Sequence, residues 1–171
     1  TDRTGKPADA ASLAGFKMIT SDFASSWLYF SPADQSANRF RYFGTQSIQN
    51  DECYVVGFAQ IPELARSVSG YRVGDQASVL LVQGLAWIDK RTFHIPRIAT
   101  WLLAPRRDIG LEGENSIVNY FPVKPEGVDK PLWVPHDVIV TIFSQGLFVR
   151  NTHRYSNFKL FRVESTIKPV E

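Results

Sequence analysis

The residue types used most often in catalysis and metal binding are sparse in this chain, and their spacing forms no recognised pattern. His94, His136 and His153 lie far apart, so no two of them can share a helical face as an i, i+4 pair. Asp137 directly follows His136, and such a pair could serve as a general base and its orienting group. Adjacent side chains of a strand point to opposite faces, so the pattern favours structural or surface histidines.

Serine chemistry has two weak candidates, each with a lysine three residues after the serine. They are Ser156-Asn157-Phe158-Lys159 and Ser165-Thr166-Ile167-Lys168. This spacing brings serine and lysine together on a helix, whereas the first lies in a predicted strand and the second in the C-terminal tail. The chain contains no nucleophile elbow, P-loop, dinucleotide-binding glycine motif or H-E-x-x-H zinc motif.

The remaining reactive groups also favour a non-catalytic protein. Glu112 and Glu114 lie in a glycine-containing stretch that predicts solvated carboxylates. The single cysteine, Cys53, excludes an internal disulfide and a multi-cysteine zinc site, and its apolar surroundings predict a buried, inert thiol. We therefore expect no catalytic site, no metal and no cofactor. A hydrolase using His136 with Asp137, or Glu112, is the alternative.

Composition and charge describe an ordinary globular protein with a preference for β-structure. Apolar residues make up 44% and charged residues 21% of the 171 residues, which excludes a disordered or collagen-like chain. Val, Ile, Thr, Phe, Tyr and Trp make up a third of the chain, and these residues favour a pleated sheet. The net charge of +2 is too small to indicate a nucleic-acid partner. The sequence contains no run of 18 apolar residues and therefore predicts no transmembrane helix.

The elements that would position any site are mostly strands. We interpret residues 1–9 as a loose lead-in and the apolar stripe around Leu13–Phe30 as a helix that ends at Pro32. Beyond it, alternating hydrophobicity and turn residues predict about eight strands. These are residues 39–46, 52–60, 78–88, 93–103, 116–123, 132–144, 147–155 and 157–165.

Short turns join most of these strands, which therefore pair antiparallel. The absence of helices between strands excludes a doubly wound α/β fold. We predict a single domain over residues 1–171: a curved antiparallel sheet that forms an unclosed half-barrel, with a helix at its open side. A β-sandwich is the rival architecture.

The strand over residues 78–88 is apolar on both faces, so each face needs a cover. One face can take the N-terminal helix, and the other takes loops, a further segment or a ligand. We predict an apolar cavity on the concave face. Its predicted ligand-binding residues are Trp87, Trp101, Leu81, Leu85 and Phe93.

A basic window lies near the C-terminus and contains no acidic residue between its first and last arginines. Arg150, Arg154 and Arg162 lie in it, and the first two share a strand face. Such a window is typical of a solvated outer face. The functional alternative is a contact with acidic head groups at a membrane surface.

One hairpin resembles a known family. The segment 84–97 reads as a strand, an Asp-Lys-Arg-Thr turn at Asp89–Thr92 and a returning strand in which Pro96 precedes Arg97. It is similar to the hairpin of the bacterial outer-membrane lipoprotein carriers and their lipoprotein-sorting relatives, which share an unclosed β-barrel covered by a helical lid. Further similar segments are Leu102-Leu103-Ala104-Pro105, Leu132-Trp133-Val134-Pro135 and residues 150–158.

This resemblance implies a non-catalytic protein of the periplasm or cell envelope that binds an apolar or acylated ligand, a lipid or a lipoprotein. It covers roughly residues 40–163. The carriers have more strand and helix upstream. The chain would therefore be the C-terminal part of a longer protein, or a branch that has lost those elements. A structural or interaction module without a small ligand is the other alternative, with the aromatic residues as plain core.

Overall fold

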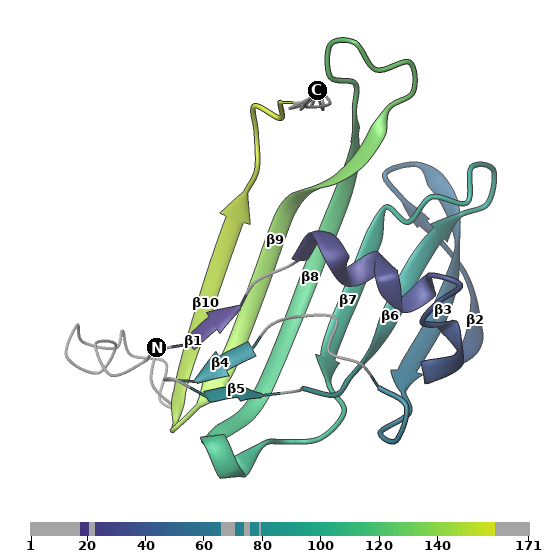
Figure 1. The fold of residues 1–171 in the computed structure, drawn as a ribbon. Coiled ribbons are helices and arrows are strands. Elements are labelled where there is room, and N and C mark those ends of the chain that lie inside the picture. The colour runs from purple at the N-terminus through teal and green to yellow at the C-terminus, as the bar shows by residue number, and fades with distance from the viewer. Residues whose placement is uncertain (1–17, 21–22, 66–70, 74–75, 79, 160–171) are drawn as a thin grey trace, which may run out of the picture.

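A computed structural model describes residues 18–20, 23–65, 71–73, 76–78 and 80–159. These residues form ten strands and three short 3-10 helices (Figure 1). The strands are β1 Met18–Thr20, β2 Asn38–Ile48, β3 Asp51–Gln60, β4 Tyr71–Val73, β5 Gln76–Ser78, β6 Val82–Asp89, β7 Arg97–Leu102, β8 Leu111–Val123, β9 Leu132–Ser144 and β10 Leu147–Arg154. The helices are η1 Phe23–Phe30, η2 Gln35–Ala37 and η3 Arg107–Ile109.

Seven strands form one antiparallel sheet in the order β10-β9-β8-β7-β6-β3-β2. Every neighbouring pair in this sheet is antiparallel. The sheet is not closed, because β10 and β2 are its two edges. The predicted unclosed half-barrel is therefore confirmed. A second, three-stranded sheet of β1, β4 and β5 crosses in front of the long strands (Figure 1).

Two tight turns fix the registers of the outermost hairpins. Gln49 and Asn50 both have positive φ angles, of 51° and 76°, between β2 and β3. Gln145 and Gly146 likewise have φ angles of 51° and 80° between β9 and β10. Two consecutive residues with positive φ form the type I′ turn, whose twist matches that of the flanking strands. Both turns join strands that the sequence predicts, residues 39–46 with 52–60 and residues 132–144 with 147–155.

The sheet has a covered face and an open face. Val82, Ala86, Ile98 and Val118 are buried on the face that η1 covers, and we call this the inner face. The outer face carries the alternate residues, such as Leu85 on β6, which is half-buried. The apolar pattern of β6 requires a cover on its inner face, and η1 provides it.

Aromatic contacts hold η1 against the inner face. The rings of Tyr29 and Phe58 stack with centroids 4.9 Å apart, and Phe30 contacts Phe58 and Phe40 at 5.3 Å. Asn38 Nδ2 donates a hydrogen bond of 3.3 Å to the Tyr29 carbonyl, which ties the end of η1 to β2. The helix therefore lies across the strands, from β8 toward β2 (Figure 1).

Several predicted boundaries differ from the structure. The strand predicted over residues 78–88 is observed as β6, Val82–Asp89, and Ser78 belongs to β5. The described part of the stripe around 13–30 contains strand β1 and the 3-10 helix η1, while residues 1–17 and 21–22 lie outside the described residues. The loop expected before residue 116 is shorter, because β8 begins at Leu111, and β7 begins only at Arg97. Residues 157–159 are not in a strand, and the rest of the strand predicted there lies outside the described residues.

Candidate functional site

The turn between β6 and β7 is built around one buried carboxylate, that of Asp89. Its Oδ1 accepts hydrogen bonds from the backbone N–H of Thr92 at 2.7 Å, the Thr92 hydroxyl at 2.8 Å and the Arg91 N–H at 2.9 Å. The Thr92 N–H bond is the main reason that the pKa of Asp89 is lowered. Three donors on one oxygen hold this turn in a single shape.

That shape places Phe93 in an unusual conformation. The Phe93 N–H donates to the Asp89 carbonyl at 3.0 Å, and the Asp89 N–H donates to the His94 carbonyl at 2.9 Å. Phe93 has a φ of 58°, in the left-handed region that bulky residues rarely adopt. Its side chain is nonetheless 70% exposed. The turn thus holds an apolar ring out in solvent, in a backbone conformation that costs free energy.

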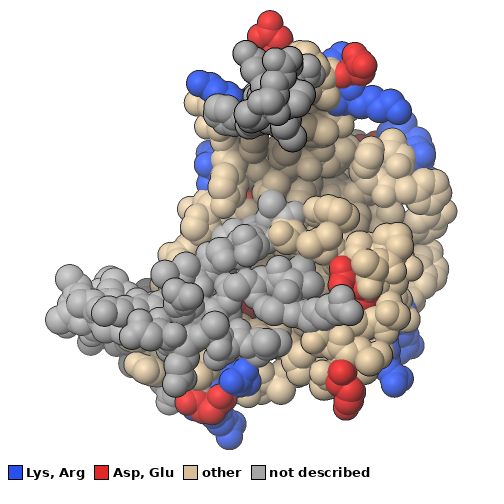
Figure 2. Space-filling model, in the orientation of Figure 1, with Lys and Arg blue, Asp and Glu red and all other residues tan. Residues whose placement is uncertain are grey.

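The exposed Phe93 ring forms part of a pocket of about 290 Å³ between η1 and the inner face of the sheet. We call it the inner pocket. It is lined by Trp27, Phe93, His94, Ile95, Tyr120 and Trp133. The rings of His94 and Trp133 lie 5.0 Å apart, so the histidine packs against the indole. On the side of the molecule in Figure 2, the charged side chains in view gather mainly at the periphery.

The polar groups of the inner pocket are few. Tyr120 is buried, and its burial raises the pKa of the phenol, while a hydrogen bond with Ser26 acts in the opposite direction. Among the described residues, the lining contains no carboxylate, amine, thiol or serine. An imidazole and a neutral phenol can orient a ligand by hydrogen bonding, but they do not form a nucleophile–base–orienter set.

The structure separates the five predicted ligand-binding residues. Phe93 lines the inner pocket, whereas Leu85 and Trp101 line a different hollow on the outer face. Trp87 lines neither: it is on the outer face, where its Nε1–H donates to Gln46 Oε1 at 2.7 Å, and the guanidinium of Arg97 lies over its ring. Leu81, half-buried before β6, also lines neither.

Sequence reasoning missed Trp27, Tyr120 and Trp133 as pocket residues. These residues come from η1, β8 and β9, which are distant in the chain. The available signal was the apolar Trp133 within Leu132-Trp133-Val134-Pro135, which the resemblance had already singled out. Only the packing of η1 on the sheet brings Trp27 to the same pocket.

The His136–Asp137 pair is closer than strand alternation predicts. His136 Nδ1 lies 2.8 Å from Asp137 Oδ2, and Arg154 Nε donates to Asp137 Oδ1 at 3.0 Å. The hydrogen bond with His136 and then that with Arg154 lower the pKa of Asp137. The expectation that these neighbours point apart is wrong. A β-bulge leaves His136 without a partner on β8, since Asn119 pairs with Asp137 and Tyr120 with Pro135.

The structure also places the remaining candidate reactive residues, Glu114, Cys53 and Glu112. Glu114 lies on the inner face opposite Ile142, and burial raises its pKa to about 7. Cys53 is fully buried, and burial is the main reason its thiol pKa is raised, as expected for an inert cysteine. Glu112 is half-buried in β8 rather than in a loop.

The structure describes only part of the basic window near the C-terminus. Arg150 and Arg154 are exposed on β10, on the same face as Thr152, and Arg154 pairs with Asp137. Arg162 lies outside the described residues, as does the second Ser-x-x-Lys segment. Among the described residues, no three His, Cys, Asp or Glu side chains gather as a metal site. No helix in the described part is long and apolar enough to cross a bilayer.

Comparisons with protein-family models, with curated proteins and with solved structures gave no match to this chain. The candidate site is therefore defined by its own geometry: an aromatic pocket at the open side of the half-barrel, bounded by η1 and by the strained Phe93 turn.

Proposed function

We propose that this protein binds an apolar or acylated ligand, such as a lipid or a lipoprotein acyl chain, in the inner pocket, without reacting with it. The observation that carries the proposal is the pocket of about 290 Å³ whose lining is aromatic and aliphatic except for His94 and the Tyr120 hydroxyl. Burying each CH₂ group of an acyl chain contributes about 0.8 kcal/mol, so such a lining supports useful affinity without specific polar contacts.

The strained Phe93 turn supports the same proposal. A protein gains no stability from holding a 70% exposed phenylalanine at a positive φ angle. A ligand that enters the pocket would cover this ring and the half-exposed Trp27 beside it. The strain is then a means of presenting apolar surface where an acyl chain enters, which a plain structural core would not need.

We also propose an envelope location, on the resemblance of the Asp89–Thr92 hairpin to that of the lipoprotein carriers. In this proposal Arg150, exposed on β10, contributes to contact with acidic head groups or with an acylated protein partner, together with Arg154 and Arg162. Arg154 contributes less, because Asp137 already neutralises it.

The test uses dodecanoate as the probe and the four tryptophan indole N–H signals of the ¹⁵N-labelled protein as reporters. We expect saturable shifts of the Trp27 and Trp133 signals, with Trp87 unchanged as an internal control. Trp27→Ser should abolish the effect, while Trp101→Ser, a matched exposed tryptophan on the outer face, should not. Absence of binding at tens of micromolar dodecanoate, with folded protein, would support the interaction module instead.

A further inference from the structure

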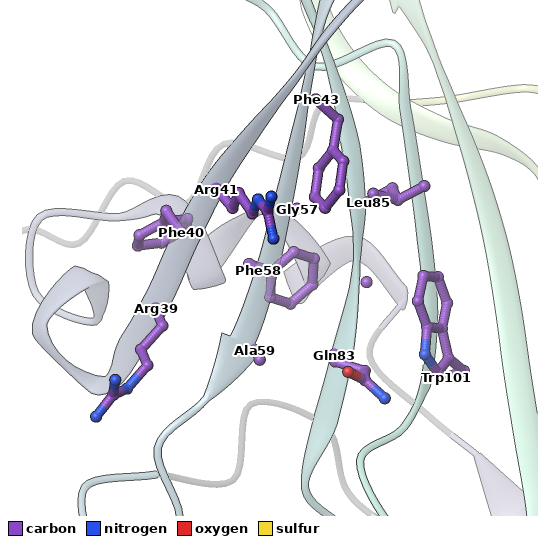
Figure 3. A pocket seen from close by; sticks show the side chains of 11 residues that line it. Arg39, Phe40, Arg41, Phe43, Gly57, Phe58, Ala59, Gln83, Leu85 and Trp101 are labelled. Atoms are coloured by element: carbon purple, nitrogen blue, oxygen red, sulfur yellow. The ribbon is translucent and has the colours of Figure 1, made fainter.

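A second hollow, of about 250 Å³, lies on the outer face across β2, β3, β6 and β7 (Figure 3). We call it the outer hollow. The side chains that shape it are Arg39, Arg41, Phe43, Gln83, Leu85 and Trp101. Strand pairing places Arg41 opposite Gly57 and Gln83 opposite Trp101, so these groups share the outer face. The sheet separates this hollow from the inner pocket.

The floor of the outer hollow is low because it is made of small residues. Gly57 and Ala59 lie on β3 between the longer side chains of β2 and β6. The Phe43 ring rests directly on Gly57, where even an added methyl group would overlap it. A β-bulge between Tyr42 and Thr45 interrupts the register there, so that Phe43 can turn back over the sheet.

The two aromatic walls are open to a ligand. Phe43 is 58% exposed and Trp101 is 38% exposed, and they bound the hollow from β2 and β7 (Figure 3). Among the described residues neither ring stacks on another aromatic ring, and the Arg41 guanidinium lies 5.4 Å from the Phe43 ring centroid. Flat apolar faces on either side of a shallow glycine floor suit a flat apolar body.

The charged side chains that line the outer hollow in the described part of the chain, Arg39 and Arg41, are both positive. Arg41 points toward Phe43 and Gly57, and Arg39 extends at the edge (Figure 3). These two arginines are two residues apart on β2, roughly 7 Å, and so lie on one face. In the described part of the chain neither makes an ion pair, and the lining contains no carboxylate. Among the described residues, the side-chain amide of Gln83 also makes no hydrogen bond.

We propose that the outer hollow binds a small aromatic carboxylate. Its carboxylate would accept hydrogen bonds from the guanidinium of Arg41, with Arg39 adding positive charge, because the guanidinium fork matches a carboxylate in geometry and charge. Its ring would lie between Phe43 and Trp101. The volume of about 250 Å³ and the two flat aromatic walls suit a ligand with one ring or two fused rings.

The test uses naphthalene-2-carboxylate as the probe and the uncharged naphthalene-2-carboxamide as its matched analogue. Binding is followed by calorimetry and by the indole N–H signals. We expect single-site binding that shifts the Trp101 signal, with the carboxamide about fivefold or more weaker. Arg41→Gln should weaken carboxylate binding by a similar factor and leave carboxamide binding unchanged. Arg150→Gln removes another exposed arginine, on β10 at the opposite edge of the sheet, and should change neither affinity.

The outcomes separate this site from the inner pocket. Trp101→Ser should abolish naphthalene-2-carboxylate binding and keep dodecanoate binding, and Trp27→Ser should do the reverse. Three results would overturn the proposal: no binding of the carboxylate to folded protein, shifts of Trp27 and Trp133 in place of Trp101, or equal affinity for the carboxylate and the carboxamide. Failure here leaves the inner-pocket proposal standing, because the two tests use different probes and different tryptophans.

Discussion

Replacing Phe93 by asparagine should separate stability from ligand binding. A non-glycine residue in the left-handed region costs about 1–2 kcal/mol, and asparagine tolerates this region better than phenylalanine. Phe93 is 70% exposed, so the substitution loses less than a third of the roughly 1.5–3 kcal/mol that full burial of a phenylalanine provides. We therefore expect Phe93→Asn to leave the free energy of unfolding unchanged or to raise it by up to about 1 kcal/mol.

Ligand affinity should change in the opposite direction. If the ring covers about two CH₂ groups of a bound acyl chain, its loss removes about 1.6 kcal/mol, which is more than a tenfold weakening of dodecanoate binding. Thermal denaturation followed by circular dichroism measures the first effect, where 1 kcal/mol corresponds to about 2–4 °C in a protein of this size. Titration with dodecanoate measures the second effect.

Phe148→Asn is the matched control. Phe148 is 43% exposed, stacks on Phe143 at 4.4 Å and lies in β10, without a positive φ angle. The Phe148→Asn substitution should destabilise the protein and leave dodecanoate binding unchanged. The reasoning is refuted if Phe93→Asn is destabilising by more than about 1 kcal/mol, or if it binds dodecanoate as tightly as the parent protein.

Four further substitutions test the packing of the sheet, the Asp89 turn and the buried Glu114 carboxyl. Gly84→Ala should destabilise by about 1–3 kcal/mol in denaturant titration, because the added methyl group would overlap the Ala99 carbonyl oxygen, whereas Gly57→Ala meets only a movable ring and should cost less. Asp89→Ala should cost about 2 kcal/mol at pH 7. Because the pKa of Asp89 is lowered in the folded protein, the loss of unfolding free energy in Asp89→Ala should be largest above pH 4. It should shrink as the pH falls through the folded-state pKa. Burial raises the pKa of Glu114 to about 7, so ionising this carboxyl should lower the free energy of unfolding as the pH rises from about 4.5 to 7. Glu114→Gln should abolish this pH dependence and raise the free energy of unfolding by on the order of 3 kcal/mol at pH 8. An unchanged pH dependence in either variant would contradict its assignment.

The strands and the tight turns could be predicted because their signals are local. Alternation along residues 132–144 and 147–154 and the turn residues Gln145 and Gly146 suffice to define a hairpin, and β9 and β10 lie there. The open antiparallel sheet follows from a series of such hairpins without crossover helices. A cover for both faces of β6 was predicted as well. Among the described residues η1 covers the inner face, and Leu85 on the outer face stays half-buried.

Alternation failed where the strands contain bulges. His136 and Asp137 were expected on opposite faces, but an extra residue in β9 lets them hydrogen-bond. The bulge that frees Phe43 to lie over Gly57 was not predicted either. A bulge adds one residue to one strand only, so it depends on the pairing partner and has little signature in a single strand.

The candidate sites depend on tertiary structure most of all. The sequence determined that β6 is apolar on both faces, but it could not say which face η1 covers, because period-two alternation is symmetric between faces. That choice placed Phe93 in the inner pocket and Leu85 and Trp101 in the outer hollow. Trp27 and Trp133 meet only because η1 packs across strands formed much later in the chain, through contacts that no local pattern encodes.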